Sequence, residues 1–226
     1  MKILAIECTH QIACVAVNNG SRVVERASGE WQKTAEAIVP LIMQVMSEAG
    51  IGPAELDGVA VSSGPGSFTA LRIGMSVAKG IAYGVGCPLV PVSTLHAMAL
   101  SACGFTAAAH LVPVIPSRPG EFFFGIYRRQ SGSCILEELD RGRCLAGELS
   151  DRLDVLAGNV ASPVRDVDEF VRHAPRLSQN CIDATFFSAA SLLSMAEVAM
   201  REGVAALPGE ASPDYRQIFV PLQKKQ

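Results

Sequence analysis

Charged residues are scarce in this sequence, and basic residues form no extended cluster. Asp, Glu, Lys and Arg make up 18% of the 226 residues, hydrophobic residues make up 49%, and the formal net charge is −3. A domain that binds nucleic acid usually carries a basic patch or stripe, whereas the one dense basic pair here is Lys224-Lys225. The composition argues against direct binding of nucleic acid. It also predicts either a large core or an apolar surface that a partner covers.

Motifs for metals and nucleophiles are missing as well. The four histidines contain no pair four residues apart and no H-E-x-x-H. The seven cysteines contain no C-x-x-C and match no zinc pattern, so we expect reduced, buried thiols in a cytoplasmic protein. We predict no bound metal and no cofactor. A Ser/His/Asp or Cys/His nucleophile stays open, because its members can be far apart in the sequence.

No hydrophobic run is long enough to cross a membrane. The N-terminus has only four apolar residues before Glu7, which is too short for a signal peptide. Between Lys79 and Arg118 no Asp, Glu, Lys or Arg occurs, but prolines interrupt this stretch, and a membrane helix needs about 20 consecutive apolar residues. We therefore expect a soluble protein without a membrane segment.

The order of the predicted elements indicates an α/β fold. Strands are predicted where short apolar runs end at turn residues, and helices where apolar residues recur at helical spacing. Pro40 lies inside the first helix and should kink it or remove one hydrogen bond. The N-terminal half has predicted strands 2–6, 12–17 and 22–27, helix 31–49, strand 57–62, helix 67–83, strand 89–92, a helix from Ser93 and strand 110–115. The order β-β-β-α-β-α-β-α is typical of a ribonuclease H-like fold.

The C-terminal half starts the same order again. Its predicted elements are strands 111–116, 121–129 and 134–139, helix 147–153, strand 154–157, helix 166–173, helix 187–202 and a tail over residues 207–226. We therefore predict two tandem ribonuclease H-like lobes, the architecture of actin, sugar kinases and heat-shock ATPases. The first lobe is predicted over residues 1–104, and a second, smaller lobe with the tail over residues 105–226.

Two segments raise the question of a phosphate site. ATP-using proteins of this architecture carry an acidic residue at the end of the first strand and a glycine-containing turn after it, which hold a metal and phosphate. Glu7 is acidic and Thr9 could bond an anion, but no glycine lets this turn approach phosphate closely. The second segment, SSGPGSFTALRIG over residues 62–74, lacks G-x-x-x-x-G-K-[ST] and G-x-S-x-G. We predict a tight turn at Pro65-Gly66 with Ser67 as the N-cap, and keep Glu7 and Thr9 as candidates for nucleotide binding.

Two of the predicted helices are too apolar for one sheet to cover. Polar residues of helix 67–83 form a single narrow stripe, and a helix that is apolar nearly all round is buried on more than one side. The second lobe, a second copy of the chain or a different subunit must cover the outer faces. We expect Gly74 and Ala78 to let another helix approach closely. The predicted partner surface comprises Val39, Met43 and Met46 of helix 31–49 and Phe68, Leu71, Ile73, Gly74, Val77, Ala78 and Ile81 of helix 67–83.

The block from Ser62 to Gly74 closely resembles the signature of the bacterial TsaB (YeaZ) family, in which Gly is usual where this chain has Ala70. The similarity extends along most of the chain. It includes KILAIECTHQIACVAV at the start, residues 34–42 with Val39-Pro40, Val92-Ser93-Thr94-Leu95, and Arg118-Pro119-Gly120-Glu121.

The resemblance implies a protein that is not catalytic alone and helps to make the threonylcarbamoyl group on an adenosine of tRNA. In this family the partner is a homologous, metal-binding subunit, TsaD, which performs the transfer, and an ATPase, TsaE, completes the set. The resemblance further implies that helices 31–49 and 67–84 pack against the same helices of TsaD and that tRNA is contacted only through the complex. Whether the isolated chain is a monomer or pairs with itself through the same apolar helix faces stays open. The alternative is an ATP-dependent small-molecule kinase with Glu7 and Thr9 at the phosphate. The histidine spacing disfavours a metallopeptidase-like enzyme.

Several positions depart from the family pattern. Glu7 replaces the usual Asp, Lys33 stands where His is common, and Ser117 lies in Pro-Ser-Arg where Asp-Ala-Arg is usual. Near the end, Pro213-Asp214-Tyr215 keeps a Pro-x-Tyr, but Gln217 replaces a usual Arg. These departures weaken the hypothesis of a residual nucleotide site and leave the apolar helix faces largely untouched.

Overall fold

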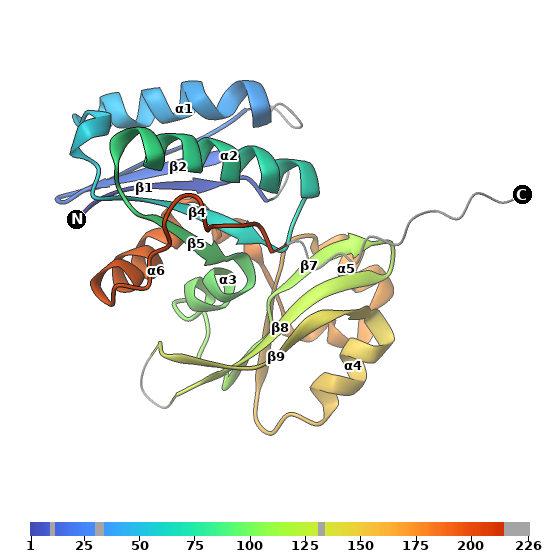
Figure 1. Ribbon diagram of the computed structural model, residues 1–226. Coiled ribbons are helices and arrows are strands. Elements are labelled where there is room, and N and C mark those ends of the chain that lie inside the picture. Colours follow the sequence, from blue (N-terminus) through green and yellow to red (C-terminus); the bar gives the residue numbers. More distant parts are fainter. Residues whose placement is uncertain (10–11, 30–33, 131–133, 215–226) are drawn as a thin grey trace, which may run out of the picture.

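The computed structural model describes residues 1–9, 12–29, 34–130 and 134–214, and it contains two mixed β-sheets (Figure 1). The first sheet has the order β3-β2-β1-β4-β5. The antiparallel strands β1, β2 and β3 are followed by β4 and β5, which run parallel to β1. Its strands are β1 (Lys2–Glu7), β2 (Cys14–Asn19), β3 (Val23–Ala27), β4 (Gly58–Gly64) and β5 (Leu89–Ser93).

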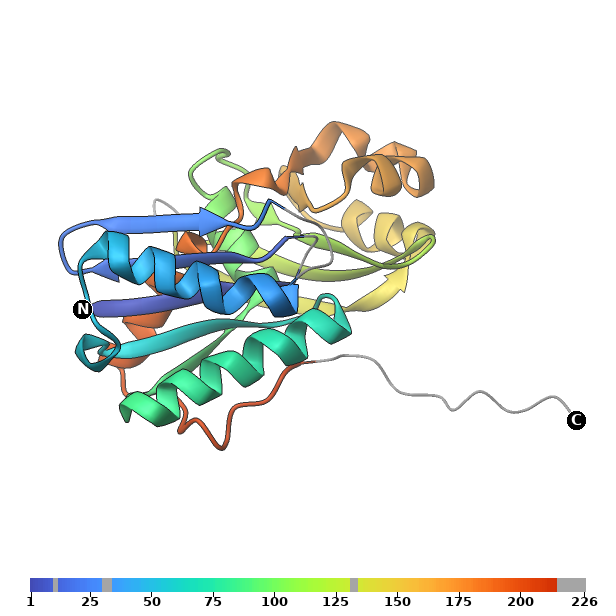
Figure 2. The same ribbon diagram turned by 90° about the horizontal axis from the view of Figure 1, so that it is seen from above.

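Helices cover both faces of the first sheet. On one face lie α1 (Thr34–Ala49) and α2 (Phe68–Val85), side by side in Figure 2, and on the other α3 (Thr94–Ala102) and α6 (Ala190–Arg201). The central strands β1 and β4 are buried on both faces, because successive side chains alternate between the two faces and helices cover both. In β1, Leu4 and Ile6 join the core under α1 and α2, whereas Ile3 and Ala5 join the core that contains α3 and α6.

The second sheet repeats the strand order of the first. Its strands are β6 (His110–Leu111), β7 (Val114–Arg118), β8 (Glu121–Arg129), β9 (Leu136–Leu145), β10 (Val160–Val164) and β11 (Cys181–Asp183). Because β10 pairs with both β6 and β7, these two short strands form one line, and the order β9-β8-β6/β7-β10-β11 matches β3-β2-β1-β4-β5. This repeat confirms the predicted tandem ribonuclease H-like architecture.

The molecule has five layers, visible in Figure 1 as helices, sheet, helices, sheet and helices. The inner helices α3 and α6 pack between the sheets, and α4 (Ala146–Asp154) and α5 (Val167–His173) cover the outer face of the second sheet. On β8, Phe123 and Tyr127 point to the inner core, and Phe122 and Phe124 to the outer one. Short 3-10 turns complete the described fold at Pro53–Glu55, Pro175–Asn180 and Ala184–Phe186.

The helix predicted over 187–202 as part of the second lobe is α6, and it packs against β1, β4 and β5 of the first sheet. The division of the chain at residue 104 stays a prediction. The chain after α6 also returns to the first sheet. Ala206 bridges to Leu89, and in the predicted tail the Asp214 N–H donates to the Ser63 carbonyl at 2.7 Å. Residues 215–226 lie outside the described part.

Some local predictions need correction. A strand was predicted over 154–157, but α4 extends to Asp154 because Leu149 and Leu153 are both buried on its inner face, and the strand follows at 160–164 after a turn at Gly158. The prediction for Pro40 needs no correction: the first helix runs through Pro40 and loses one hydrogen bond there, because proline has no N–H to donate. Pro40 is exposed, so water can bond the carbonyl that loses its partner. The predicted residues 31–33 of that helix lie outside the described part.

Candidate functional site

An apolar groove runs between α1 and α2 on the outer face of the first sheet. It encloses about 620 Å³. Figure 2 shows the two helices that form it, lying next to each other with no other element above them. The groove is lined by Val39, Ile42, Met43, Met46, Ser47, Ile51, Pro53, Val77, Gly80 and Ile81. We call this surface the α1–α2 groove.

Half of the predicted partner surface lies in this groove. Val39, Met43, Met46, Val77 and Ile81 line it, and Met43 and Val39 expose 69% and 48% of their surface. The sequence pattern missed the ends of the groove, where Ile51 and Pro53 follow α1, and missed Gly80, which opens its wall. The sequence does offer one sign of Gly80: it is a glycine between Val77 and Ile81, the apolar residues of α2 that line the groove.

The remaining predicted surface residues lie elsewhere on α2. Phe68 is 39% exposed and carries the Arg72 guanidinium 3.9 Å from its ring centroid, while Ile73 is partly buried against the core. Leu71 and Ala78 are 1% and 0% exposed, so they belong to the protein core. An Ala78→Arg substitution would therefore disrupt folding and is no test of a partner surface.

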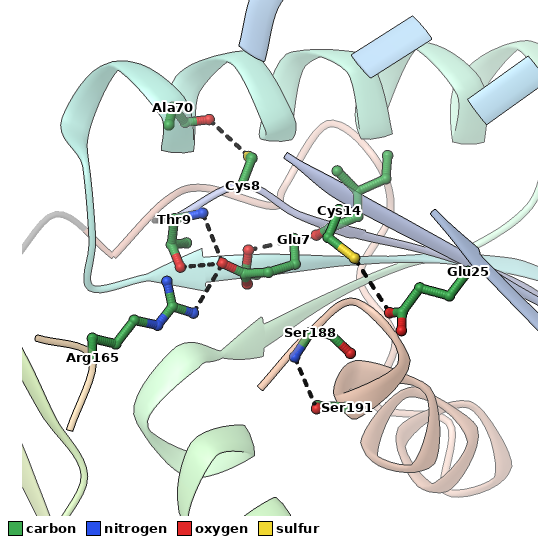
Figure 3. Close-up of polar contacts among 11 residues, drawn as sticks. Glu7, Cys8, Thr9, Cys14, Glu25, Ala70, Arg165, Ser188 and Ser191 are labelled. Carbon is green, nitrogen blue, oxygen red and sulfur yellow. Dashed lines mark hydrogen bonds and ion pairs between the residues drawn. The ribbon is translucent and has the colours of Figure 1, made fainter. Parts of the chain in front are cut away.

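Gly74 serves the packing of α2 on β1 and leaves no room for a second helix. A Cβ atom at this position would lie 2.3 Å from the Cys8 Sγ atom. The Cys8 thiol donates to the Ala70 carbonyl at 3.0 Å, and burial raises the pKa of this thiol to about 12 (Figure 3). The expectation that Gly74 lets a partner helix approach is therefore wrong. Gly74 instead lets α2 lie close to the sheet of its own chain.

The segment over residues 62–74 closes against the loop that follows β1. The Ser67 N–H donates to the Thr9 carbonyl at 3.1 Å, and a Cβ at Gly66 would lie 2.5 Å from the Thr9 Cβ. Ser67 occupies the predicted N-cap position, but its side chain makes no capping hydrogen bond. Gly64 has a φ of +111°, and a Cβ there would lie 2.6 Å from the Asp214 carbonyl oxygen. The glycines of this segment are explained by close contacts within the chain.

Glu7 and Thr9, the candidates for nucleotide binding, are hydrogen-bonded to each other, and Glu7 also pairs with an arginine from the second half of the chain (Figure 3). The Thr9 N–H donates to Glu7 Oε1 at 2.8 Å, and the Thr9 hydroxyl donates to the same oxygen. Arg165, directly after β10, donates from Nη2 to Glu7 Oε1 at 3.1 Å. The side chains of Glu7 and Arg165 are 4% and 3% exposed. We call this buried ion pair the Glu7–Arg165 pair.

Sequence patterns gave no sign of Arg165, which is 158 residues away from Glu7. The one available signal is that a lone arginine follows the apolar strand β10. Its guanidinium also lies 4.6 Å from the Phe187 ring centroid, a cation–π distance. The positive charge of Arg165 disfavours a metal cation at Glu7, because like charges repel strongly where water is excluded.

Within the described ranges, no three His, Cys, Asp or Glu side chains gather as a metal site, and no helix is long and apolar enough to span a bilayer. His10 lies outside those ranges. The buried thiols are poor nucleophiles, since burial raises the pKa of Cys8 and Cys14 to about 12.

Comparison with known proteins gives a consistent result. A family model described as "TsaD: tRNA N6-adenosine threonylcarbamoyltransferase" matches residues 26–146, which include α1 and α2. The chain is 32% identical over 129 residues to the tRNA threonylcarbamoyladenosine biosynthesis protein TsaB of Escherichia coli, a match over 57% of this chain and 56% of that protein. It is 30% identical over 132 residues to TsaB of Haemophilus influenzae, over 58% and 52% of the two chains.

These matches span about half the length of the curated relatives. Among solved structures, YeaZ from Pseudomonas aeruginosa superposes with a TM-score of 0.79 at 24% identity, over 95% of this chain and 99% of that one. At that identity the similarity shows the shared fold, and it extends over nearly the whole length of both chains.

Proposed function

We propose that this chain, which belongs to the tRNA N6-adenosine threonylcarbamoyltransferase family and within it to the TsaB (YeaZ) proteins, is a non-catalytic subunit for making threonylcarbamoyladenosine in tRNA. Its proposed role is to dock on a homologous, metal-binding subunit of the TsaD type and to activate it. A TsaE-type ATPase would supply the nucleotide hydrolysis.

The α1–α2 groove is the observation that carries this proposal. Two of its residues, Met43 and Val39, expose much of their surface, although fully burying such a side chain is worth about 1.5–3 kcal/mol. A large apolar surface of this kind is typical of a protein interface. The matched family segment, residues 26–146, contains both helices, so a homologous partner has equivalent helices. Two such pairs can pack as a four-helix bundle that buries both apolar faces.

The surroundings of Glu7 support a role without catalysis of its own. One carboxylate oxygen already accepts from Thr9 and Arg165, and the arginine charge opposes binding of Mg²⁺ beside it. For the same reason the alternative, an ATP-dependent small-molecule kinase, is not favoured. The net charge of −3 favours contact with tRNA through the complex, since phosphate binding relies on clustered Lys and Arg.

The proposal is tested by two neighbouring substitutions on α1. Met43→Lys places a charge in the groove, and Gln44→Lys places the same charge on the adjacent exposed position, four residues from Glu48. We expect Met43→Lys to weaken binding to the homologous transferase of the same organism by at least about tenfold, because a buried unpaired ammonium is costly. Gln44→Lys should leave binding unchanged. Calorimetry gives both affinities, and equal affinities for the two variants would contradict the proposal.

The same variants test whether the isolated chain pairs with itself through the groove. Sedimentation equilibrium measures the mass in solution. We expect a concentration-dependent dimer for the unmodified chain and for Gln44→Lys, and a monomer for Met43→Lys. A dimer that survives Met43→Lys would place self-association on another surface.

A further inference from the structure

A second cavity, of about 550 Å³, lies on the other side of the first sheet from the α1–α2 groove. The Glu7–Arg165 pair forms part of its wall, and the ends of β2 and β3 and the segment between β11 and α6 form the rest. Figure 3 shows Glu7, Arg165, Glu25 and Ser188 converging on this region from four separate parts of the chain. We call it the Glu7–Arg165 cavity.

Two buried polar atoms in this wall have no partner among the described residues. They are Oε2 of Glu7 and Nη1 of Arg165, on side chains that are 4% and 3% exposed. A buried carboxylate oxygen without a donor and a buried guanidinium N–H without an acceptor are both costly, so such groups in folded proteins usually have a partner. One accepts and the other donates, and both belong to residues that line the same cavity.

We propose that the Glu7–Arg165 cavity binds a small neutral molecule that presents a hydrogen-bond donor beside an acceptor, as a primary carboxamide or a urea does. Its N–H would donate to Glu7 Oε2 and its carbonyl would accept from Arg165 Nη1. The ion pair carries no net charge, so a neutral head group completes both sets of hydrogen bonds without burying a further charge. A carboxylate would bring its oxygens against Glu7, and an amidinium would bring its N–H groups against Arg165.

Other side chains of the protein hold Glu7 and Arg165, the two residues that would bind the ligand, in fixed positions. Thr9 fixes Glu7 through two hydrogen bonds, and the Phe187 ring under the guanidinium fixes the plane of Arg165. Two other charged residues line the cavity and are already engaged. Glu25 Oε1 accepts from the Ala190 N–H at 2.7 Å, and Arg26 pairs with Glu48 at 2.5 Å. The Glu7–Arg165 pair carries the two buried atoms without a partner, so the proposal assigns to it the selection of the head group, and Phe187 supplies an apolar surface for the rest of the molecule.

Three probes that share one ring test this selection: benzamide, benzoate and benzamidine. The first has a donor and an acceptor, the second only acceptors, and the third only donors and a positive charge. Titration followed by protein NMR gives each affinity. We expect benzamide to bind at least about tenfold more tightly than either of the others, because each of these leaves one buried polar atom unpaired. Equal affinities, or tighter binding of benzoate or benzamidine, would overturn the proposal.

Variants locate the binding without disturbing the ion pair. Thr185 is exposed at the rim of the cavity, so Thr185→Trp fills the opening and Thr185→Ala leaves it clear. Benzamide binding should be lost in the first and kept in the second. Met43→Lys, in the α1–α2 groove, should leave it unchanged. Loss of binding in Met43→Lys, or its persistence in Thr185→Trp, would overturn the assignment. The inference does not rest on the proposed function, because Met43→Lys tests subunit binding separately.

Discussion

Two hollows of similar size, 620 Å³ and 550 Å³, lie on opposite faces of the first sheet and differ in almost every chemical respect. The α1–α2 groove is made by two helices close together in the sequence and is lined by apolar side chains that water still reaches. The Glu7–Arg165 cavity is made by segments as distant in the sequence as Glu7 and Ser188 and contains a buried ion pair. Removing a side chain from the groove should affect association, whereas removing one from the cavity should affect folding itself.

The largest expected effect is a loss of stability when the buried ion pair of the cavity is broken. Arg165→Ala leaves the Glu7 carboxylate buried without its cation, which costs about 3–5 kcal/mol of the free energy of unfolding. Urea unfolding followed by circular dichroism measures this. The control is Arg172→Ala on α5, whose guanidinium is 66% exposed and pairs with Glu169 on the surface, and which should cost less than about 1 kcal/mol. Similar losses in the two variants would mean that the buried pair contributes no more than a surface pair.

The next effect concerns what lies beneath the groove. Gly74→Ala places a methyl group 2.3 Å from the Cys8 Sγ atom, and such overpacking costs about 1–3 kcal/mol. Replacing Cys8 with alanine as well removes the clashing sulfur, so the double variant should recover part of the loss. The four unfolding free energies of this cycle give the coupling between the two positions. Independent, additive effects would contradict the close contact of α2 with β1.

Cys8, which lies under α2, also makes the folding stability of the protein depend on pH. Burial raises the pKa of this thiol from 9.0 to about 12 in the folded chain. Below pH 9 the thiol is neutral in both states and its contribution is fully present; above pH 9 only the unfolded chain loses the proton, so stability falls until about pH 12. Cys8→Ser keeps a donor but does not ionise there, so its stability should fall less steeply over that window, by up to about 1.4 kcal/mol per pH unit. Equal slopes would contradict the burial of Cys8.

The smallest expected effect is of opposite sign and lies in the groove wall. A Cβ at Gly80 meets nothing within 4 Å, and alanine is favoured over glycine in a helix by up to about 1 kcal/mol. Gly80→Ala should therefore raise the free energy of unfolding slightly. Gly74→Ala, on the inner face of the same helix, should lower it. If both substitutions destabilise equally, the inner and outer faces of α2 are wrongly assigned.

The groove could be predicted from the sequence and the cavity could not, for a physical reason. Apolar residues at helical spacing, such as Val39, Met43 and Met46, reveal a second stripe on α1 without knowledge of any other element. The same pattern cannot say which of two helix faces meets the sheet. Leu71, Gly74 and Ala78 are therefore predicted on the outer face of α2, whereas the structure has them on its inner face, against the sheet.

The strand repeat was recognisable as well, because each predicted strand is a local pattern. The partner of Glu7 was not recognisable, since Arg165 meets it only after both sheets have formed. The sequence around Glu7 and around Arg165 contains no pattern that predicts this contact. For the same reason α6 could be predicted as a helix but not as a cover for the first sheet.

The position of α6 has a consequence for synthesis of the chain. The first sheet is complete once β5 has left the ribosome, but its inner face is then covered only by α3 until residues 190–201 follow. At about 5–20 residues per second this interval lasts several seconds or more. During it, the apolar side chains of Ile3, Ala5 and Val90 lack the helix that covers them in the finished protein, so we expect chaperones to bind the nascent chain at this face.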